Sequence, residues 1–212
     1  MDTFIFILEI IGTIAFASSG AMIAIEKKMD IFGVNVLGAT TAVGGGVMRD
    51  VILGLAPPTA FSKPVYILIA VVTSTILFAI AYVKMDAMRS ITKSEYYDRL
   101  MFWCDTAGLG IFTVVGIQTA SRVMQENNAF FFVFIGVLTG VGGGVLRDIM
   151  AGETPYILVK HIYACAAIAG GVVCVVSRNM LGSAAGILLG LAVTVLLRFL
   201  AAHFHWNLMR VQ

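Results

Sequence analysis

Long apolar segments alternate with short polar connections along almost the whole chain. A helix that crosses a membrane needs about 20 predominantly apolar residues, and stretches of this kind recur throughout the sequence. We predict seven membrane-spanning helices with these boundaries: residues 4–25, 31–55, 64–84, 101–121, 129–151, 157–176 and 181–203. The pattern therefore predicts an all-α polytopic membrane protein.

Two parts of the sequence resemble each other. The segment Thr41–Asp50 recurs as Thr139–Asp148, with Gly-Gly-Gly and Arg-Asp at the same places and an offset of 98 residues. Upstream matches, at an offset of 96, pair Glu9, Gly12, Phe16, Gly20 and Ala24 with Asp105, Gly108, Phe112, Gly116 and Ala120. Self-similarity over about 50 residues indicates an internal repeat.

The longest polar connection, residues 85–100, separates the two repeats. We expect a first three-helix repeat at 1–84, a second at 101–176, and a seventh helix with a C-terminal tail at 177–212. Because three is an odd number of crossings, the second repeat enters the membrane from the opposite side. The sequence thus predicts inverted repeats, an arrangement found in many transport proteins.

Each repeat carries three consecutive glycines inside its second apolar segment. Glycine in a helix interior costs about 1 kcal/mol relative to alanine, so a triplet favours a kink or a break. Non-helical backbone at membrane depth is tolerated only inside the protein or beside a water-filled cavity. The alternative is that the glycines only allow close helix packing, which is the role we expect for Gly182, Gly186 and Gly190 of the last span. The residues predicted to form a pore and helix break are Gly44, Gly45, Gly46, Gly142, Gly143 and Gly144.

An Arg-Asp pair follows each triplet inside a predicted span. An arginine at the centre of a membrane helix costs about 2.5–3.5 kcal/mol on insertion scales, so such residues are functional candidates. We expect pathway-lining or gating charges on each side of the midplane at Arg49, Asp50, Arg147 and Asp148. The alternative is a buried charge pair that locks the bundle. Weaker candidates for lining are Glu9, Asp105, Thr41, Thr139, Gln118 and Tyr163.

Composition is consistent with a lipid environment. Of the residues, 59% are hydrophobic and only 12% are charged, against about 25% charged in soluble domains, and the mean hydropathy is +0.96. A formal net charge of +2 argues against a nucleic-acid partner. The three cysteines form no CxxC pair, and neither metal-ligand spacing nor a catalytic constellation is recognisable. We therefore expect no enzyme activity, no metal and no cofactor.

The distribution of basic residues predicts the orientation, because they gather on the cytoplasmic side. With the N-terminus outside, nine lie inside: Lys27, Lys28, Lys84, Arg89, Lys93, Arg99, Lys160, Arg198 and Arg210. Three lie outside: Lys63, Arg122 and Arg178. We predict an outer N-terminus and a cytoplasmic C-terminus.

Two Gly-Gly-Gly-x-x-Arg-Asp elements in three-helix repeats, followed by a seventh helix, resemble the prokaryotic branch of the trimeric intracellular cation (TRIC) channel family. The same unit is also described as a glycine transporter domain. The resemblance covers residues 4–203 and places the family motif on the triplets and on both Arg-Asp pairs. It implies a homotrimer in the lipid of a bacterial or archaeal inner membrane. It also implies one pore per protomer, kinked second and fifth helices at the pore, and potassium or sodium as permeating ions.

Three functions remain open from the sequence. The leading hypothesis is a passive channel for monovalent cations. The alternative is a secondary transporter of a small solute such as glycine, because inverted repeats and intramembrane charges suit alternating access as well. A non-conducting membrane scaffold, in which the glycines serve assembly, is the third.

Overall fold

The computed structural model of the protein describes residues 2–83, 95–124, 128–159, 162–204 and 206. Seven of its helices are long and apolar enough to cross a membrane, as the sequence predicts. They are α1 (Asp2–Glu26), α2 (Ile31–Ile52), α4 (Val65–Val83), α6 (Glu95–Val123), α7 (Ala129–Met150), α9 (Tyr163–Leu181) and α10 (Ser183–His203). Two short helices precede α4 and α9 in the chain: α3 (Thr59–Ser62) and α8 (Tyr156–Val159).

Some boundaries differ from the predicted ones. α6 begins at Glu95, so the last residues of the predicted connection 85–100 are helical, while 85–94 lie outside the described residues. The predicted span 157–176 combined two elements, because α8 ends at Val159 and the membrane helix begins at Tyr163. The polar residues Lys160 and His161 stand in the sequence between the two elements and were the signal for this division. Five basic residues used for the orientation also lie outside the described residues: Lys84, Arg89, Lys93, Lys160 and Arg210.

The second helices of the two repeats begin in the same way. The side chain of Asp30 accepts a hydrogen bond from the Gly33 amide at 2.7 Å, and that of Asn128 accepts one from the Phe131 amide at 3.0 Å. Such caps satisfy amide groups that the first helical turn leaves unpaired. The two capping residues are 98 positions apart, which extends the repeat to the start of these helices.

Both helices also end in the same way, at a glycine in the left-handed region. Gly54 has a φ of 70° and Gly152 one of 72°, a conformation that favours glycine. The next amide in each case returns to a carbonyl of the last turn, at 2.8 Å to Asp50 and 2.9 Å to Asp148. This is the Schellman pattern of helix termination. It ends both helices just after the Arg-Asp pairs.

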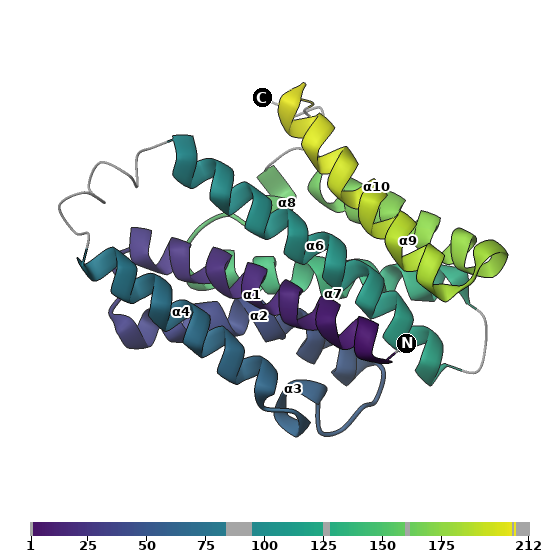
Figure 1. The fold of residues 1–212 in the computed structure, drawn as a ribbon, viewed down its shortest axis with the longest axis horizontal. Coiled ribbons are helices and arrows are strands. Elements are labelled where there is room, and N and C mark those ends of the chain that lie inside the picture. Colours follow the sequence, from purple (N-terminus) through teal and green to yellow (C-terminus); the bar gives the residue numbers. More distant parts are fainter. Residues whose placement is uncertain (1, 84–94, 125–127, 160–161, 205, 207–212) are drawn as a thin grey trace.

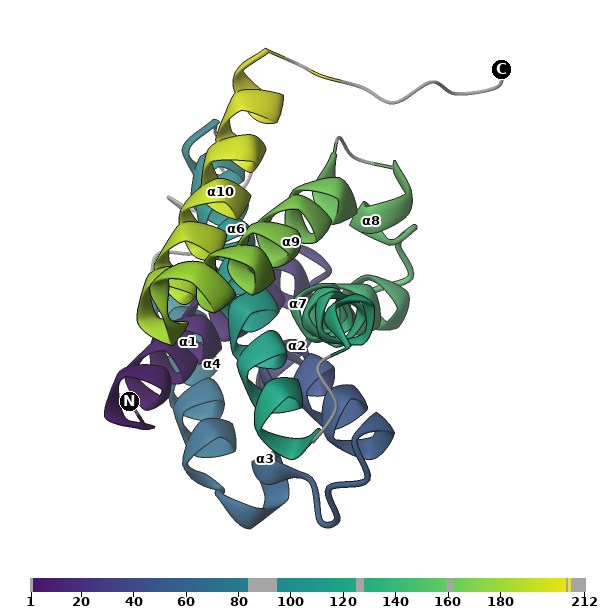
Figure 2. The same cartoon turned by 90° about the vertical axis from the view of Figure 1, so that its right-hand side faces the viewer.

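The two central helices, α1 and α6, lie side by side (Figure 1). α4 packs against α1 on one side of this pair, whereas α9 and α10 pack against α6 on the other side. α2 and α7 contact both each other and the central pair (Figure 2). The helices α1, α2 and α4 thus form one three-helix bundle and α6, α7 and α9 form a second, with α10 added to the second along α9.

The glycine triplets lie within unbroken helices. α2 runs through Gly44–Gly46 and α7 through Gly142–Gly144, so the predicted helix break is wrong. The triplets meet where α2 contacts α7. Because the two backbones approach this closely, packing offsets the cost of glycine in a helix. The close contacts favour the alternative, that the glycines allow tight helix packing. That they also line a pore stays a prediction.

The two repeats make equivalent contacts with each other at this crossing. A Cβ atom on Gly45 would overlap the carbonyl oxygen of Thr139, and one on Gly143 would overlap that of Thr41. The two threonines occupy the same position in the two repeats, and so do the two glycines. The repeats therefore meet through matching surfaces, as two copies related by a two-fold axis do. That one repeat is inverted relative to the other in a membrane stays a prediction.

α9 and α10 form a tight hairpin. Gly182 lies between them with a φ of 89°. A Cβ atom on Gly186 would lie 2.8 Å from the Cβ atom of Arg178, and one on Gly190 would lie 2.6 Å from that of Cys174. The packing role predicted for the last span is confirmed for Gly186 and Gly190, whereas Gly182 makes the turn.

Candidate functional site

Arg49 and Asp50 form a buried ion pair near the end of α2. The Nε atom of Arg49 donates a hydrogen bond to Oδ1 of Asp50 at 2.7 Å, and Nη2 lies 2.7 Å from the same oxygen. Their side chains are 6% and 0% exposed. Neighbouring side chains leave a helix about 100° apart, yet the long arginine side chain bends back onto its neighbour. The charge of each residue is therefore balanced locally.

The second carboxylate oxygen of Asp50 holds the connection that follows α2. Oδ2 accepts the amide hydrogen bond of Thr59, the first residue of α3, at 2.7 Å. This bond satisfies a backbone donor that the start of a helix leaves unpaired. Asp50 thus couples the ion pair to the short helix beside it.

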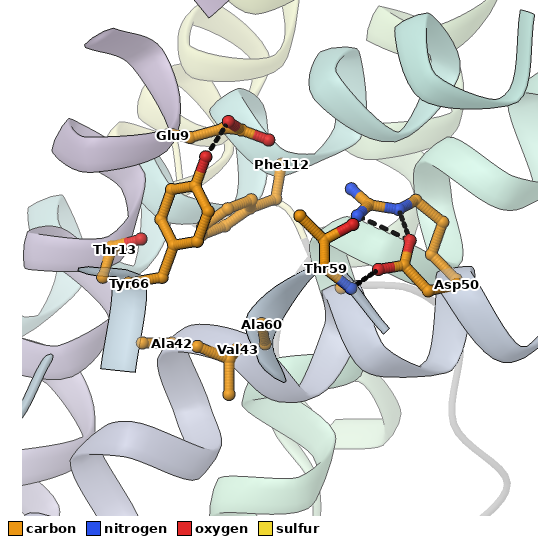
Figure 3. Close-up of a pocket in the computed structure, with 11 residues that line it drawn as sticks. Glu9, Thr13, Ala42, Val43, Asp50, Thr59, Ala60, Tyr66 and Phe112 are labelled. Carbon is orange, nitrogen blue, oxygen red and sulfur yellow. Dashed lines mark hydrogen bonds and ion pairs between the residues drawn. The ribbon is translucent and has the colours of Figure 1, made fainter. Parts of the chain in front are cut away.

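A cavity, here called the first cavity, lies beside this ion pair (Figure 3). Glu9, Arg49, Asp50 and Tyr66 supply its charged groups and a phenol, and the Tyr66 hydroxyl donates a hydrogen bond to Glu9. The volume open to the centre of a water molecule is about 40 Å³, whereas one water needs about 10–15 Å³. The first cavity therefore admits a few water molecules or a partly dehydrated ion. We call Glu9, Arg49, Asp50 and Tyr66 the first cluster.

Arg147 is the centre of a second, more deeply buried cluster. Its Nε atom donates to Oδ1 of Asp148 at 2.8 Å, and its Nη1 atom donates to Oδ1 of Asp105 at 2.8 Å. Nη1 also donates to the hydroxyl oxygen of Ser19 on α1. The arginine side chain is 0% exposed and the two carboxylates are at most 3% exposed. This guanidinium therefore joins α1, α6 and α7.

The two clusters are built alike. Oδ2 of Asp148 accepts the amide hydrogen bond of Tyr156, the first residue of α8, at 2.7 Å, as Asp50 does with the start of α3. A Cβ atom on Gly144 would lie 3.4 Å from the Tyr163 hydroxyl and 3.8 Å from Oδ1 of Asp105. The second cluster thus comprises Asp105, Arg147, Asp148 and Tyr163.

Tyr66 is a residue of the site that the sequence reasoning missed. It lies 97 positions before Tyr163, and each tyrosine belongs to the third long helix of its repeat. Extending the repeat alignment from the first two helices to the third would have found it. Tyr163 itself was among the weaker candidates and is 3% exposed.

The seventh helix adds an arginine to the second cluster alone. The side chain of Arg198, on α10, is 4% exposed, and its Nη2 atom lies 3.8 Å from Oδ2 of Asp105. Its guanidinium carbon lies 4.8 Å from the ring centre of Phe102 and 4.7 Å from that of Tyr163. Arg198 was predicted to be a cytoplasmic charge, but the residue is buried in the bundle. Its position inside the predicted span 181–203 was the signal for this.

A second cavity adjoins the second cluster at the other end of α1 from Glu9. Its volume open to the centre of a water molecule is about 300 Å³. Four carboxylates and one ammonium line it: Glu26, Asp98, Asp148, Glu153 and Lys27. The ammonium of Lys27 donates a hydrogen bond to Glu153, which raises the pKa of Lys27 above its ordinary value. The lining therefore has an excess of negative charge.

Two phenylalanines pack against each other between α1 and α6. The rings of Phe16 on α1 and Phe112 on α6 are 5.3 Å apart and almost fully buried. The two residues occupy the same position in the two repeats. A Cβ atom on Gly143 would lie 3.4 Å from the Phe16 ring, so the aromatic pair packs onto the crossing of α2 and α7. Phe112 also lines the first cavity.

The remaining predicted site residues belong to helix contacts. Thr41 and Thr139 are buried, and each hydroxyl donates to a carbonyl one turn earlier in its own helix at 2.6 Å. Gln118 accepts a hydrogen bond from the Ser183 hydroxyl at 2.8 Å, which joins α6 to the start of α10. The structure thus brings Glu9 to the first Arg-Asp pair and brings Asp105 and Tyr163 to the second. It does not bring Thr41, Thr139 or Gln118 into hydrogen bonds with either pair.

Within the part of the chain that the structure describes, no three His, Cys, Asp or Glu side chains are grouped so as to hold a metal ion. Most of the carboxylate oxygens of the two clusters accept hydrogen bonds from arginine, tyrosine or backbone amides. The two clusters therefore consist of paired charges inside an apolar helix bundle.

Comparison with known proteins finds similarity along nearly the whole chain. A family model described as Glycine transporter matches residues 6–82 and 102–179, which are the two repeats. The UPF0126 inner membrane protein YadS of Escherichia coli K12 is 37% identical to this chain over 207 residues. The match covers 95% of this chain and 93% of that protein.

Two solved structures have the same fold. The TRIC trimeric intracellular cation channel orthologue from Rhodobacter sphaeroides is 30% identical with a TM-score of 0.85, covering 96% of this chain and 100% of that one. A prokaryotic TRIC channel crystallised in 0.5 M KCl is 31% identical with a TM-score of 0.86, covering 98% and 100%. The resemblance in fold therefore includes nearly all of each chain.

Proposed function

Because this chain belongs to the family of the prokaryotic TRIC channels, we propose that it is a passive channel for monovalent cations, chiefly potassium and sodium. It is a multi-pass membrane protein, and its solved neighbours are named as cation channels. The proposed pathway runs through each protomer of a homotrimer, from the first cavity to the second. The N-terminus lies outside the inner membrane and the C-terminus in the cytoplasm.

One observation supports this proposal most strongly: carboxylates exceed basic groups at both ends of the proposed pathway. The first cavity presents Glu9 and Asp50 against Arg49. The second cavity presents four carboxylates against one ammonium. Mouths with excess negative charge concentrate cations and repel anions, as acidic rings do in cation channels.

The intramembrane arginines do not present bare positive charge to a permeating ion. Arg49 is paired with Asp50, and Arg147 is paired with both Asp105 and Asp148. An isolated arginine at this depth would oppose cation entry. Pairing with carboxylates removes most of this electrostatic barrier. The same carboxylates accept hydrogen bonds from the first residues of α3 and α8, so the positions of these short helices depend on the ion pairs.

The proposed gate is the aromatic pair of Phe16 and Phe112 at the crossing of α2 and α7. Apolar constrictions close ion pathways because they exclude water. At Gly45 and Gly143 the opposing helix presents backbone atoms, whereas the side chains of Leu146 and Met48 lie against Gly44 and Gly142, so a movement of α2 against α7 has to displace these two side chains. The crossing of α2 and α7 thus lies next to the apolar constriction formed by Phe16 and Phe112.

Recording from purified protein in planar bilayers tests the proposal. With a tenfold gradient of potassium chloride, we expect unitary currents that reverse close to the potassium equilibrium potential. Empty bilayers and heat-denatured protein are the controls. A reversal potential near the chloride value, or no current from folded protein, would falsify the channel assignment.

A secondary transporter of a small zwitterion such as glycine is the second candidate, and the first cavity is the observation that favours it. Glu9 and Arg49 both line this cavity, so an amino acid could place its ammonium near the carboxylate and its carboxylate near the guanidinium. Counterflow of labelled glycine in proteoliposomes separates the two functions. Saturable exchange without unitary conductance supports transport, and conductance without exchange supports the channel.

A further inference from the structure

The two charged clusters differ in their balance of charge. The first has one arginine and two carboxylates: Arg49, Glu9 and Asp50. The second has two arginines and two carboxylates: Arg147, Arg198, Asp105 and Asp148. With all groups ionised, the first cluster carries one net negative charge and the second carries none. The difference is the arginine that α10 contributes from outside the repeats.

Arg198 lies near Asp105 without forming a hydrogen bond to it. The distance of 3.8 Å from Nη2 to Oδ2 is longer than that of a hydrogen bond. Among the described residues, Oδ2 of Asp105, Nε and Nη2 of Arg198 and the Tyr163 hydroxyl all lack a hydrogen-bond partner. Buried polar atoms are normally paired with protein, water or an ion. The four atoms therefore form a group of unsatisfied polar atoms beside Asp105.

Aromatic rings hold Arg198 in this position. Its guanidinium lies within 5 Å of the ring centres of Phe102 and Tyr163. Cation–π contacts stabilise a buried cation without fixing it through directed hydrogen bonds. The second cavity reaches the second cluster at Asp148. The positive charge is thus retained beside Asp105, although the nearest oxygen of this carboxylate is left without a donor.

We propose that Arg198 is a resident counter-cation of the pathway. It occupies the place beside Asp105 that a permeating monovalent cation takes beside Glu9 in the other half. It thereby prevents cations from binding tightly in the second cluster. This inference rests on the proposed channel function. When the charge of Arg198 is removed, the second cluster gains one net negative charge, and a potassium ion then binds at Oδ2 of Asp105.

Thermal unfolding of the purified protein in detergent tests cation binding directly. We compare Arg198→Gln with the wild type in about 200 mM potassium chloride and in choline chloride, whose cation is too large for the cluster. For Arg198→Gln we expect a Tm about 2–4 °C higher in potassium than in choline, because a bound ligand stabilises the folded state. The wild type, in which only the site beside Glu9 can bind potassium, should show a smaller difference. If Arg198 has only a structural role, its loss lowers the Tm equally in both salts, and this result would overturn the proposal.

Four further variants sharpen this test. Arg198→Lys keeps a cation at the site, so potassium should stabilise it no more than it stabilises the wild type. Arg198→Gln combined with Asp105→Asn removes the proposed ligand, so the potassium effect should fall back to that of the wild type. Arg178→Gln, in the last turn of α9, is the matched control without an added effect. Should Arg198→Gln fail to fold, Arg198→Met keeps the length and the ring contacts without the charge. A potassium effect that stays above that of the wild type after Asp105→Asn contradicts the proposal.

Conductance measurements distinguish this inference from the proposed function. Currents of the wild type test the proposed channel function independently of the role of Arg198. The potassium dependence of the Tm tests cation binding beside Asp105, even if the protein does not conduct. In a conducting protein we expect Arg198→Gln to reach half-maximal current at a potassium concentration at least twofold lower. Arg178→Gln should match the wild type. Identical saturation curves for Arg198→Gln and the wild type would overturn the proposed role of Arg198.

Discussion

At the scale of single residues, Asp50 and Asp148 each make two kinds of contact at membrane depth. One oxygen pairs with the neighbouring arginine, and the other accepts a backbone amide from the short helix that follows. Both side chains are buried. Burying a charge is costly unless it is paired and hydrogen-bonded. These carboxylates therefore stabilise the bundle.

Asp50→Asn tests this structural role. We expect the free energy of unfolding to fall by about 3–5 kcal/mol, because Arg49 would remain buried without its counter-charge. A thermal melt in detergent should then show a Tm lower by roughly 10 °C. Combining the change with Arg49→Gln removes both charges and should restore most of the stability. Equal melting of Asp50→Asn and the wild type would contradict the role described for this pair.

Glu9 differs from Asp50 because it lies in the wall of the first cavity and bonds to a tyrosine rather than an arginine. Glu9→Gln should preserve the contact with Tyr66 and remove the excess negative charge of the cavity. We expect potassium conductance to fall about fivefold, since a unit charge at 4 Å in a water-like medium is worth about 1 kcal/mol. Single-channel recording in symmetric potassium chloride measures this change. Tyr66→Phe, which keeps the charge of Glu9, is the control. Equal conductance of Glu9→Gln and the wild type would show that Glu9 does not line the pathway.

At the scale of helices, the crossing of α2 and α7 joins the two repeats, as the contact between α1 and α6 also does. Its glycines differ sharply in how close the opposing helix comes. A Cβ atom on Gly45 would overlap a backbone carbonyl, whereas the nearest atom to one on Gly46 is Nη2 of Arg49 at 3.8 Å. Backbone atoms cannot move aside as a flexible side chain can. Neighbouring glycines in the same triplet thus have different roles.

Gly45→Ala and Gly46→Ala form a matched pair for testing the crossing. We expect Gly45→Ala to lose about 1–3 kcal/mol or more of stability, because the extra methyl group forces the helices apart. Gly46→Ala should melt at the wild-type temperature or above it, since alanine is favoured over glycine in helices by up to about 1 kcal/mol. Thermal melts of both purified variants measure the difference. Equal melting temperatures would mean that the helices do not approach as closely as described.

At the scale of the whole molecule, the proposed assembly is a homotrimer with a pathway in each protomer. Its basis is the similarity to a channel orthologue described as trimeric. Many large apolar side chains lie on the molecular surface, among them Phe32, Phe130 and Met180. In a membrane protein such a surface contacts lipid or another copy of the chain.

The mass of the purified protein tests the trimer. Light scattering after size-exclusion chromatography, corrected for detergent, should give a protein mass of about 68 kDa, three times the 22.7 kDa of one chain. Chemical cross-linking at increasing reagent concentration should stop at three chains. A mass near that of one chain, in a preparation that still conducts, would show that the pathway does not need the trimer.

Local properties of the chain were sufficient to predict the seven helices and the internal repeat. Hydrophobic length and self-similarity can be evaluated within short stretches. The same comparison identified Glu9 and Asp105 as equivalent positions, and each lies beside the Arg-Asp pair of its own repeat. The Arg-Asp pairs themselves were recognisable because ionised residues are rare inside membrane spans.

Only the packing of distant segments decided the shape of α2 and α7 and the place of Arg198. A glycine triplet favours a break when water lies opposite and a close crossing when another backbone does, and here the opposing backbone belongs to the other repeat. An arginine near a helix end reaches solvent unless a carboxylate and aromatic rings of other helices surround it, as Asp105, Phe102 and Tyr163 do for Arg198. In both cases the free energy depends on a partner far away in the sequence, and local pattern carries no information about that partner.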